Sequence, residues 1–202
     1  MKSRYLVVIL GCLPILANAF PIANTGEGLN VLVGGTDSII ATYQGNSAAY
    51  SNDLYFMLNG LGNPGDDGIL GNDLFIFNNH TSPVGSTANL GSFTIGTELM
   101  FRLHVNNTGF DYITGSASRN PDTHTHARVQ ENWLPNETLV SFEDLHNGPF
   151  DFNDLSFSFT NTVTTQPPAV PEPGSIVLLM IGLAGLGVVS QRKARLKKVE
   201  AL

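Results

Sequence analysis

The stretch Asp154-Leu155-Ser156-Phe157-Ser158-Phe159-Thr160 indicates the fold of this 202-residue chain most clearly. Apolar and hydroxyl side chains alternate along it, so Leu155, Phe157 and Phe159 fall on one face of an extended strand. Residues 101–105, Phe-Arg-Leu-His-Val, alternate in the same way. A period of two residues is typical of strands that bury one face, and it argues against a helix in both places.

Further segments rich in β-branched and aromatic residues are separated by clusters of Gly, Asn, Asp and Pro. We expect strands at residues 28–33, 38–43, 53–58, 73–77, 92–95, 98–105, 124–130, 137–142 and 154–163. No amphipathic helical pattern lies between them. The sequence therefore predicts an all-β domain over residues 20–160, an antiparallel β-sandwich of jelly-roll or immunoglobulin-like type.

The charge of residues 20–170 is strongly acidic. Three arginines stand against fifteen Asp and Glu residues there, a formal charge of −12, whereas the whole chain carries −7. The other cations lie close to the two ends of the sequence. A surface of this kind repels nucleic acid and anionic lipid and attracts divalent cations, so we expect no nucleic-acid partner.

The first nineteen residues have the pattern of a secretory signal peptide. Two basic residues precede an apolar run from Tyr5 to Leu16, and the small residues Ala17 and Ala19 form a site for signal peptidase. A second interpretation is a lipobox at residues 9–12, which would place a lipid on Cys12. Cleavage after Ala19 would leave an exported protein without cysteine, and therefore one that does not rely on disulfides.

The C-terminal region combines a linker, an apolar run and a basic segment. Residues 161–170 are rich in Thr and Pro and are expected to form a linker. An uncharged apolar run at about residues 174–190 then predicts a transmembrane helix about 25 Å long, somewhat short of a roughly 30 Å hydrocarbon core. The basic residues of segment 191–198 would hold the C-terminus in the cytoplasm; they are Arg192, Lys193, Arg195, Lys197 and Lys198.

The order of these parts, with Pro171-Glu172-Pro173-Gly174 before the apolar run, resembles a PEP-CTERM sorting tail over residues 171–198. The resemblance implies recognition by an exosortase, a membrane cysteine transpeptidase that cuts near the motif. It therefore implies an exported protein that is anchored transiently in the inner membrane and then passes to the cell surface or extracellular matrix. The residues alone leave an ordinary single-pass anchor as the alternative.

The densest group of acids lies on both sides of a Gly148-Pro149 turn. Four carboxylates and Asn153 fall within twelve residues there, and hard oxygen ligands around a turn suit Ca²⁺. The candidate Ca²⁺ ligands are Glu143, Asp144, Asp151, Asn153 and Asp154. The alternative is a solvated acidic turn that holds no cofactor.

The same segment carries a second resemblance. Phe142-Glu143-Asp144-Leu145, followed by Asp151 and Asn153-Asp154-Leu155, is similar to the F-E-D-L…D-x-N-D signature of an uncharacterised β-domain family of exported bacterial proteins. The likeness is sharpest over residues 118–160. The family's usual glycine-rich turn with a further acid is replaced here by residues 145–150, which removes one ligand.

The tripeptide Asn-Asp-Leu opens an aromatic strand at residues 52–54, 72–74 and 153–155. Asn and Asp form side-chain turns where strands begin, and this explains the pattern simply. The second interpretation is that the three carboxylates gather at one end of the domain and bind an ion.

Catalytic patterns are weak in this chain. The mature region has no Cys nucleophile and no G-x-S-x-G motif. Asp122, His124 and His126 alternate as transition-metal ligands do, but no further His cluster accompanies them, and we expect an exposed strand instead. We predict a non-enzymatic structural or adhesive component of a biofilm. The alternatives are a calcium-dependent module that binds extracellular polysaccharide, and a secreted hydrolase that uses two of the clustered acids.

Overall fold

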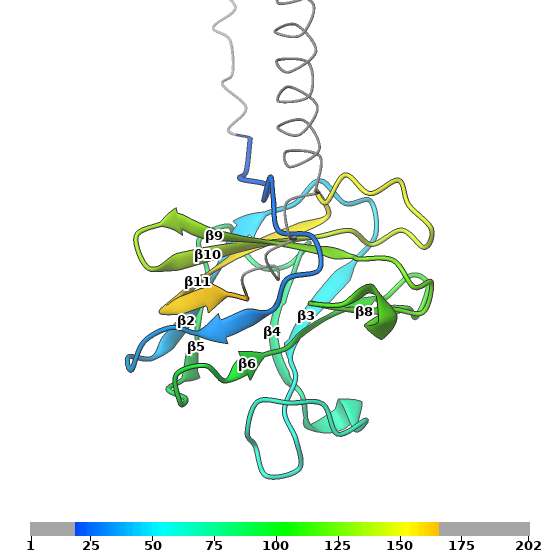
Figure 1. Cartoon of the computed structure of the whole chain (residues 1–202). Helices are drawn as coiled ribbons and strands as arrows, with labels where there is room; N and C mark the ends of the chain where they lie inside the picture. The colour runs from blue at the N-terminus through cyan, green and yellow to red at the C-terminus, as the bar shows by residue number, and fades with distance from the viewer. Residues whose placement is uncertain (1–18, 166–202) are drawn as a thin grey trace, which may run out of the picture. The chain divides into compact units, whose positions relative to one another are not determined.

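The structure, a computed structural model, describes residues 19–165 (Figure 1). The predicted signal peptide (residues 1–19), except for Ala19, and the predicted transmembrane helix of the sorting tail (residues 171–198) lie outside these residues. Between residues 19 and 165, no helix is both long and apolar enough to cross a membrane. The strands are β1 (Val31–Val33), β2 (Ile39–Gly45), β3 (Asn52–Phe56), β4 (Leu74–Asn78), β5 (Thr87–Gly91), β6 (Glu98–Leu99), β7 (Phe101–Val105), β8 (Asp111–Ile113), β9 (Ala127–Leu134), β10 (Glu137–Phe142), β11 (Leu155–Thr160) and β12 (Thr162–Thr164); the short 3-10 helices are η1 (Leu70–Asn72) and η2 (Ala117–Arg119).

The strands form three antiparallel sheets. One has five strands in the order β5-β2-β11-β10-β9, one has four in the order β4-β3-β7-β8, and one has three in the order β12-β1-β6. In the five-stranded sheet, β10 and β11 are neighbours in register, with Phe142 opposite Leu155 and Val140 opposite Phe157. The prediction of an all-β domain with antiparallel sheets is confirmed.

Aromatic side chains join the five-stranded sheet to the four-stranded sheet. Phe159 on β11 stacks on Phe101 of β7 with ring centroids 4.1 Å apart, and Phe157 stacks on Phe77 of β4 at 5.7 Å. The apolar face that the sequence predicted for β11 is fully buried. Contacts of this kind between the inner faces of two sheets support the sandwich arrangement.

The opposite face of β11 is also buried, because the N-terminal segment covers it. The backbone N–H of Ala23 donates to Ser141 Oγ at 2.8 Å, and this hydroxyl lies 2.7 Å from Ser156 Oγ. Phe20 packs so closely on Gly45 of β2 that a Cβ there would lie 2.6 Å from the Phe20 Cβ. The residues that follow the predicted cleavage site are therefore part of the folded domain.

Several strand predictions were wrong in detail. Residues 92–95 form a loop, and the strand β5 lies just before them. Its sequence, T-A-N-L-G, contains Asn and Gly, which strands disfavour. The short strand β8 was missed, and the segment predicted at 124–130 becomes a strand only at Ala127. The strand predicted at 154–163 is divided into β11 and β12, and β12 pairs with β1 inside the segment 161–170 that was expected to form the linker.

The stacked aromatics predict the outcome of one substitution. Phe101→Ala should lower the free energy of unfolding by about 3–5 kcal/mol, because it leaves a cavity between the two sheets. Phe75→Ala removes a ring that is 50 % exposed and should cost far less. Urea denaturation of the full chain in detergent, followed by Trp133 fluorescence, measures both. Equal losses would show that the rings between the sheets are not the main packing contact.

Candidate functional site: a buried acidic cluster

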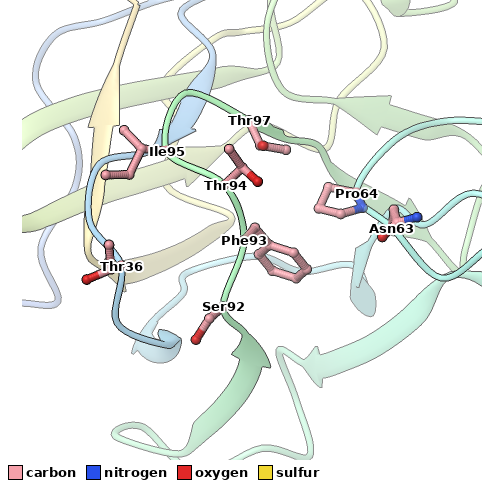
Figure 2. A pocket seen from close by; sticks show the side chains of 8 residues that line it. All are labelled: Thr36, Asn63, Pro64, Ser92, Phe93, Thr94, Ile95 and Thr97. Atoms are coloured by element: carbon pink, nitrogen blue, oxygen red, sulfur yellow. The ribbon is translucent and has the colours of Figure 1, made fainter.

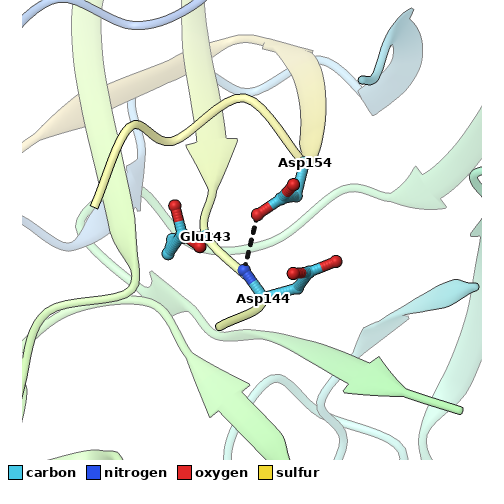
Figure 3. A group of neighbouring side chains, drawn as sticks. All are labelled: Glu143, Asp144 and Asp154. Atoms are coloured by element: carbon cyan, nitrogen blue, oxygen red, sulfur yellow. Dashed lines mark hydrogen bonds between the residues drawn. The ribbon is translucent and has the colours of Figure 1, made fainter. Parts of the chain in front are cut away.

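Three carboxylates meet where β10 ends and β11 begins. Glu143 and Asp144 directly follow β10, and Asp154 directly precedes β11, so the pairing of Phe142 with Leu155 brings them together. One oxygen from each lies within 4.8 Å of the others. Figure 3 shows the Asp154 carboxylate directed toward the backbone nitrogen of Asp144, with the Glu143 side chain close by. The exposed fractions of Glu143, Asp144 and Asp154 are 1 %, 3 % and 8 %. The cluster is therefore buried and is not a solvated acidic turn.

Backbone amides fix the cluster in place. The N–H of Asp144 donates to Asp154 Oδ2 at 2.8 Å, the dashed contact in Figure 3. The Glu143 carboxylate accepts from three N–H groups at 3.1–3.3 Å, and these belong to Leu145, Asp151 and Phe152. Glu143 therefore closes the loop that separates the two strands, and the Asp144 N–H fixes the Asp154 carboxylate beside it.

The electrostatics of the cluster are unfavourable as long as all three groups are ionised. None of the ion pairs found within residues 19–165 includes any of them. Burial, reinforced by the charge of Asp154, raises the pKa of Glu143 to about 8. Burial also raises the pKa of Asp154 to about 6, and it raises the pKa of Asp144. Buried carboxylates of this kind are normally paired, protonated or bound to a metal ion.

A pocket of about 380 Å³ opens beside the cluster. Its lining comprises Ser47, Ala49, Tyr50, Asp144, Leu145, Asp151, Asn153 and Asp154. The structure thus gathers three of the five predicted calcium ligands into the cluster and places the other two on the wall of the adjoining pocket. Those two contact each other, since Asn153 Nδ2 donates to Asp151 Oδ2 at 2.6 Å.

One residue of the site was not among the predicted ligands. Asn52, the first residue of β3, is fully buried, and its Nδ2 donates to Asp144 Oδ2 at 2.7 Å. Its side-chain oxygen, Oδ1, is buried without a hydrogen-bond partner. The repeated Asn-Asp-Leu pattern was the signal that could have identified it, because the copies at 52–54 and 153–155 meet at this cluster.

The idea that the three Asn-Asp-Leu carboxylates gather to bind one ion is nevertheless wrong. Asp53 Oδ1 accepts a hydrogen bond from Asn78 at 2.7 Å, away from the cluster. Asp73 pairs with Arg102 at 3.0 Å, and both side chains are almost fully buried. Only Asp154 contributes a carboxylate to the cluster, so the shared tripeptide serves three different local purposes.

His126 forms a second buried polar contact next to the cluster. Its Nε2 lies 2.9 Å from Asp122 Oδ2, and its Nδ1 lies 2.9 Å from the Glu143 carbonyl oxygen. Burial opposes ionisation of Asp122, but hydrogen bonds from the Asn147 N–H and His126 outweigh it and lower the Asp122 pKa to about 2. Both ring nitrogens of His126 therefore face oxygen atoms of the chain at hydrogen-bond distance.

This contact corrects the prediction of an exposed strand around His126. The ring is fully buried and stacks on Tyr112 at a centroid distance of 3.6 Å, while His124 stays exposed and β9 begins only after both. Asp122 and the Glu143 carbonyl oxygen thus occupy both ring nitrogens of His126, and the exposed His124 does not share this buried contact.

A second, uncharged pocket of about 770 Å³ lies elsewhere on the domain. It is lined by Thr36, Asn63, Pro64, Ser92, Phe93, Thr94, Ile95 and Thr97, which Figure 2 shows around the Phe93 ring. Phe93 is partly buried and contacts Phe56 of the core at a centroid distance of 5.7 Å. The pocket thus combines a fixed aromatic ring with neutral hydroxyl and amide groups.

The comparison with known protein families gives one match. Residues 169–193 match the PEP-CTERM protein-sorting motif, which confirms the tail predicted from the sequence. The match includes the Pro-Glu-Pro-Gly segment and lies outside the residues that the structure describes. No curated protein and no solved structure was found to match the chain.

The raised pKa values predict an unusual dependence of stability on pH in the absence of metal. The unfolded chain has released both protons by about pH 5, whereas the folded domain holds a proton on Glu143 up to about pH 8 and one on Asp154 up to about pH 6. The free energy of unfolding should therefore fall as pH rises, by at most about 1.4 kcal/mol per pH unit for each proton. The lowered pKa of Asp122 affects the free energy of unfolding only below about pH 4, which is outside this pH range.

Asp154→Asn should flatten this dependence, because it removes one titrating group and also the charge that raises the pKa of Glu143. Urea denaturation in EDTA at intervals between pH 5 and 8 measures the slope. Asp37→Asn, at an exposed position, serves as the control and should keep the wild-type slope. If Asp154→Asn also keeps it, these carboxylates do not hold the protons.

Proposed function

We propose, from the premise of a PEP-CTERM sorting motif at residues 169–193, that this chain is an exported protein of the cell envelope or extracellular matrix. The motif indicates sorting by an exosortase-type system, and this observation carries the proposal. The processing partners are then signal peptidase at the N-terminus and an exosortase-like membrane protease at the C-terminus. The basic residues after the apolar run would keep the C-terminus in the cytoplasm until the protease releases the domain.

The domain delivered in this way is, we propose, a β-sandwich with a structural or adhesive role in a biofilm and no catalytic activity. Its formal charge of −12 over residues 20–170 favours solubility outside the cell and gives it affinity for divalent cations rather than for polyanions. A hydrolase that uses the clustered acids would need its substrate to reach side chains that are at most 8 % exposed. Their hydrogen bonds to the backbone support a structural role.

The sorting proposal predicts the mass of the mature protein. In cells with the exosortase, the chain should begin near Phe20, which packs on Gly45 in the folded domain, and should lack Arg192–Leu202. Intact-mass spectrometry of the envelope fraction reports both ends in one measurement. Pro171→Ala combined with Glu172→Ala should leave the tail attached, whereas Pro168→Ala, just upstream of the motif, should not.

Two outcomes would contradict this processing. An envelope-bound form that retains Lys197 and Lys198 in wild-type cells would refute sorting by an exosortase. Lipid attached to Cys12 would refute cleavage after Ala19. Cys12→Ser separates the two N-terminal interpretations, because it blocks lipidation and leaves the Ala17 and Ala19 cleavage site intact.

The uncharged pocket around Phe93 favours a second candidate function, a module that binds extracellular polysaccharide. Sugar rings commonly pack on aromatic faces, and Ser92, Thr94 and Asn63 supply neutral hydrogen-bonding groups around the ring. The acidic domain disfavours anionic polymers, so a neutral polysaccharide is the expected ligand. Any calcium dependence would then act through the stability of the domain.

Affinity electrophoresis of the full chain through gels that contain neutral or acidic polysaccharide tests this function. The chain should be retarded by a neutral polymer alone, and Phe93→Ala should abolish the retardation. Phe75→Ala, which removes another partly exposed ring, is the matched control and should migrate as the wild type does. A melting curve of each variant verifies folding, and retardation of Phe93→Ala equal to that of the wild type would exclude this pocket.

A further inference from the structure

We propose that Glu143, Asp144 and Asp154, completed by the side-chain oxygen of Asn52, form a Ca²⁺ site that ties the five-stranded sheet to the four-stranded sheet. The carboxylates flank β10 and β11 of the first sheet, whereas Asn52 begins β3 of the second. A cation held by both sets of oxygens joins the two layers at this end of the domain. The site belongs to the domain itself and does not depend on how the chain is sorted.

The geometry of the cluster suits a calcium ion. Ca²⁺ binds oxygens at about 2.3–2.6 Å, so two of its ligands are at most about 5 Å apart. One oxygen from each of the three carboxylates meets this condition, since all lie within 4.8 Å of one another. The adjoining pocket, whose wall includes Asp151 and Asn153, gives the ion a path from solvent and space for water ligands.

The charge of the cluster requires neutralisation. Three carboxylates lie together with no Lys or Arg partner within the described residues, and the nearby His126 ring contacts Asp122 at 2.9 Å. A divalent cation removes this repulsion without protons and satisfies several oxygen lone pairs at once. Mg²⁺ is the weaker candidate, because it dehydrates reluctantly and is usually held by only one or two carboxylates.

The unpartnered oxygen of Asn52 is an independent observation that indicates a missing ligand. The amide faces the cluster, because its Nδ2 donates to Asp144 at 2.7 Å, and Oδ1 on the same amide is buried without a partner. Buried amide oxygens are rarely left unpaired, since they lose their hydrogen bonds to water without a replacement. A half-turn of the Asn52 amide about its Cβ–Cγ bond directs Oδ1 toward Asp144. In this orientation the amide oxygen and the Asp144 carboxylate repel each other, unless a cation lies between the two oxygens and attracts both.

The test uses the full chain, purified in detergent and stripped with EDTA. Isothermal titration with CaCl₂ should show one saturable site per chain, and calcium should raise the melting temperature by several degrees at a hundred-fold excess over Kd. NaCl at matched ionic strength controls for general screening of an acidic protein. The absence of a saturable site in the wild type would overturn the proposal, as would an equal rise in NaCl. An equal rise in MgCl₂ would overturn the assignment to Ca²⁺.

Substitutions locate the site. Asp144→Asn and Asp154→Asn should each abolish most of the calcium-specific rise in melting temperature, whereas the exposed Asp37→Asn should leave it unchanged. Asn52→Asp tests whether Asn52 is a calcium ligand or only packs beside the cluster. The added buried charge should lower the melting temperature in EDTA, and calcium should then produce a larger rise than in the wild type. If Asn52→Asp destabilises the domain and calcium does not reverse the effect, Asn52 is not a ligand.

Discussion

The antiparallel pairing of β10 with β11 is the constraint on which the rest of this structure depends. Because Phe142 lies opposite Leu155, the residues just outside the two strands must meet, and these are Glu143, Asp144 and Asp154. The same register turns Phe157 and Phe159 toward the four-stranded sheet, where they stack on Phe77 and Phe101. One pairing therefore sets both the aromatic core and the acidic cluster at its end.

The two features have opposite energetic consequences. Burial of the aromatic rings stabilises the domain, whereas burial of three carboxylates is costly unless a proton or a cation neutralises them. The chain retains the costly group, and it holds Glu143 with three backbone N–H groups instead of a basic side chain. Calcium binding would convert this destabilising cluster into a contact between sheets, and the stability of the exported domain would then depend on the calcium concentration outside the cell.

The sequence predicted those parts of the fold that depend on residues close together in the chain. The alternation of Leu155, Phe157 and Phe159 was enough to define the buried face of β11, and the acidic loop was enough to select Glu143, Asp144 and Asp154. It did not reveal β5, because Asn89 and Gly91 resemble turn residues and pairing with β2 overrides their preference. Asn52 was missed as a site residue because the Asn-Asp-Leu copies at 52–54 and 153–155 were explained as turns at strand starts, whereas its contact with Asp144, 92 positions away, joins two sheets.

The pairing of β1 with β12 has a consequence for export. These strands are the first and the last of the described domain, and Val33 lies opposite Thr162. A secreted chain crosses the membrane from its N-terminus onward, so β1 emerges long before its partner. The three-stranded sheet can close only after almost the whole domain has been translocated, because so non-local a contact cannot form earlier. In a chain exported from its N-terminus onward, the pairing of β1 with β12 would therefore be completed only when the residues just before the sorting motif have crossed the membrane.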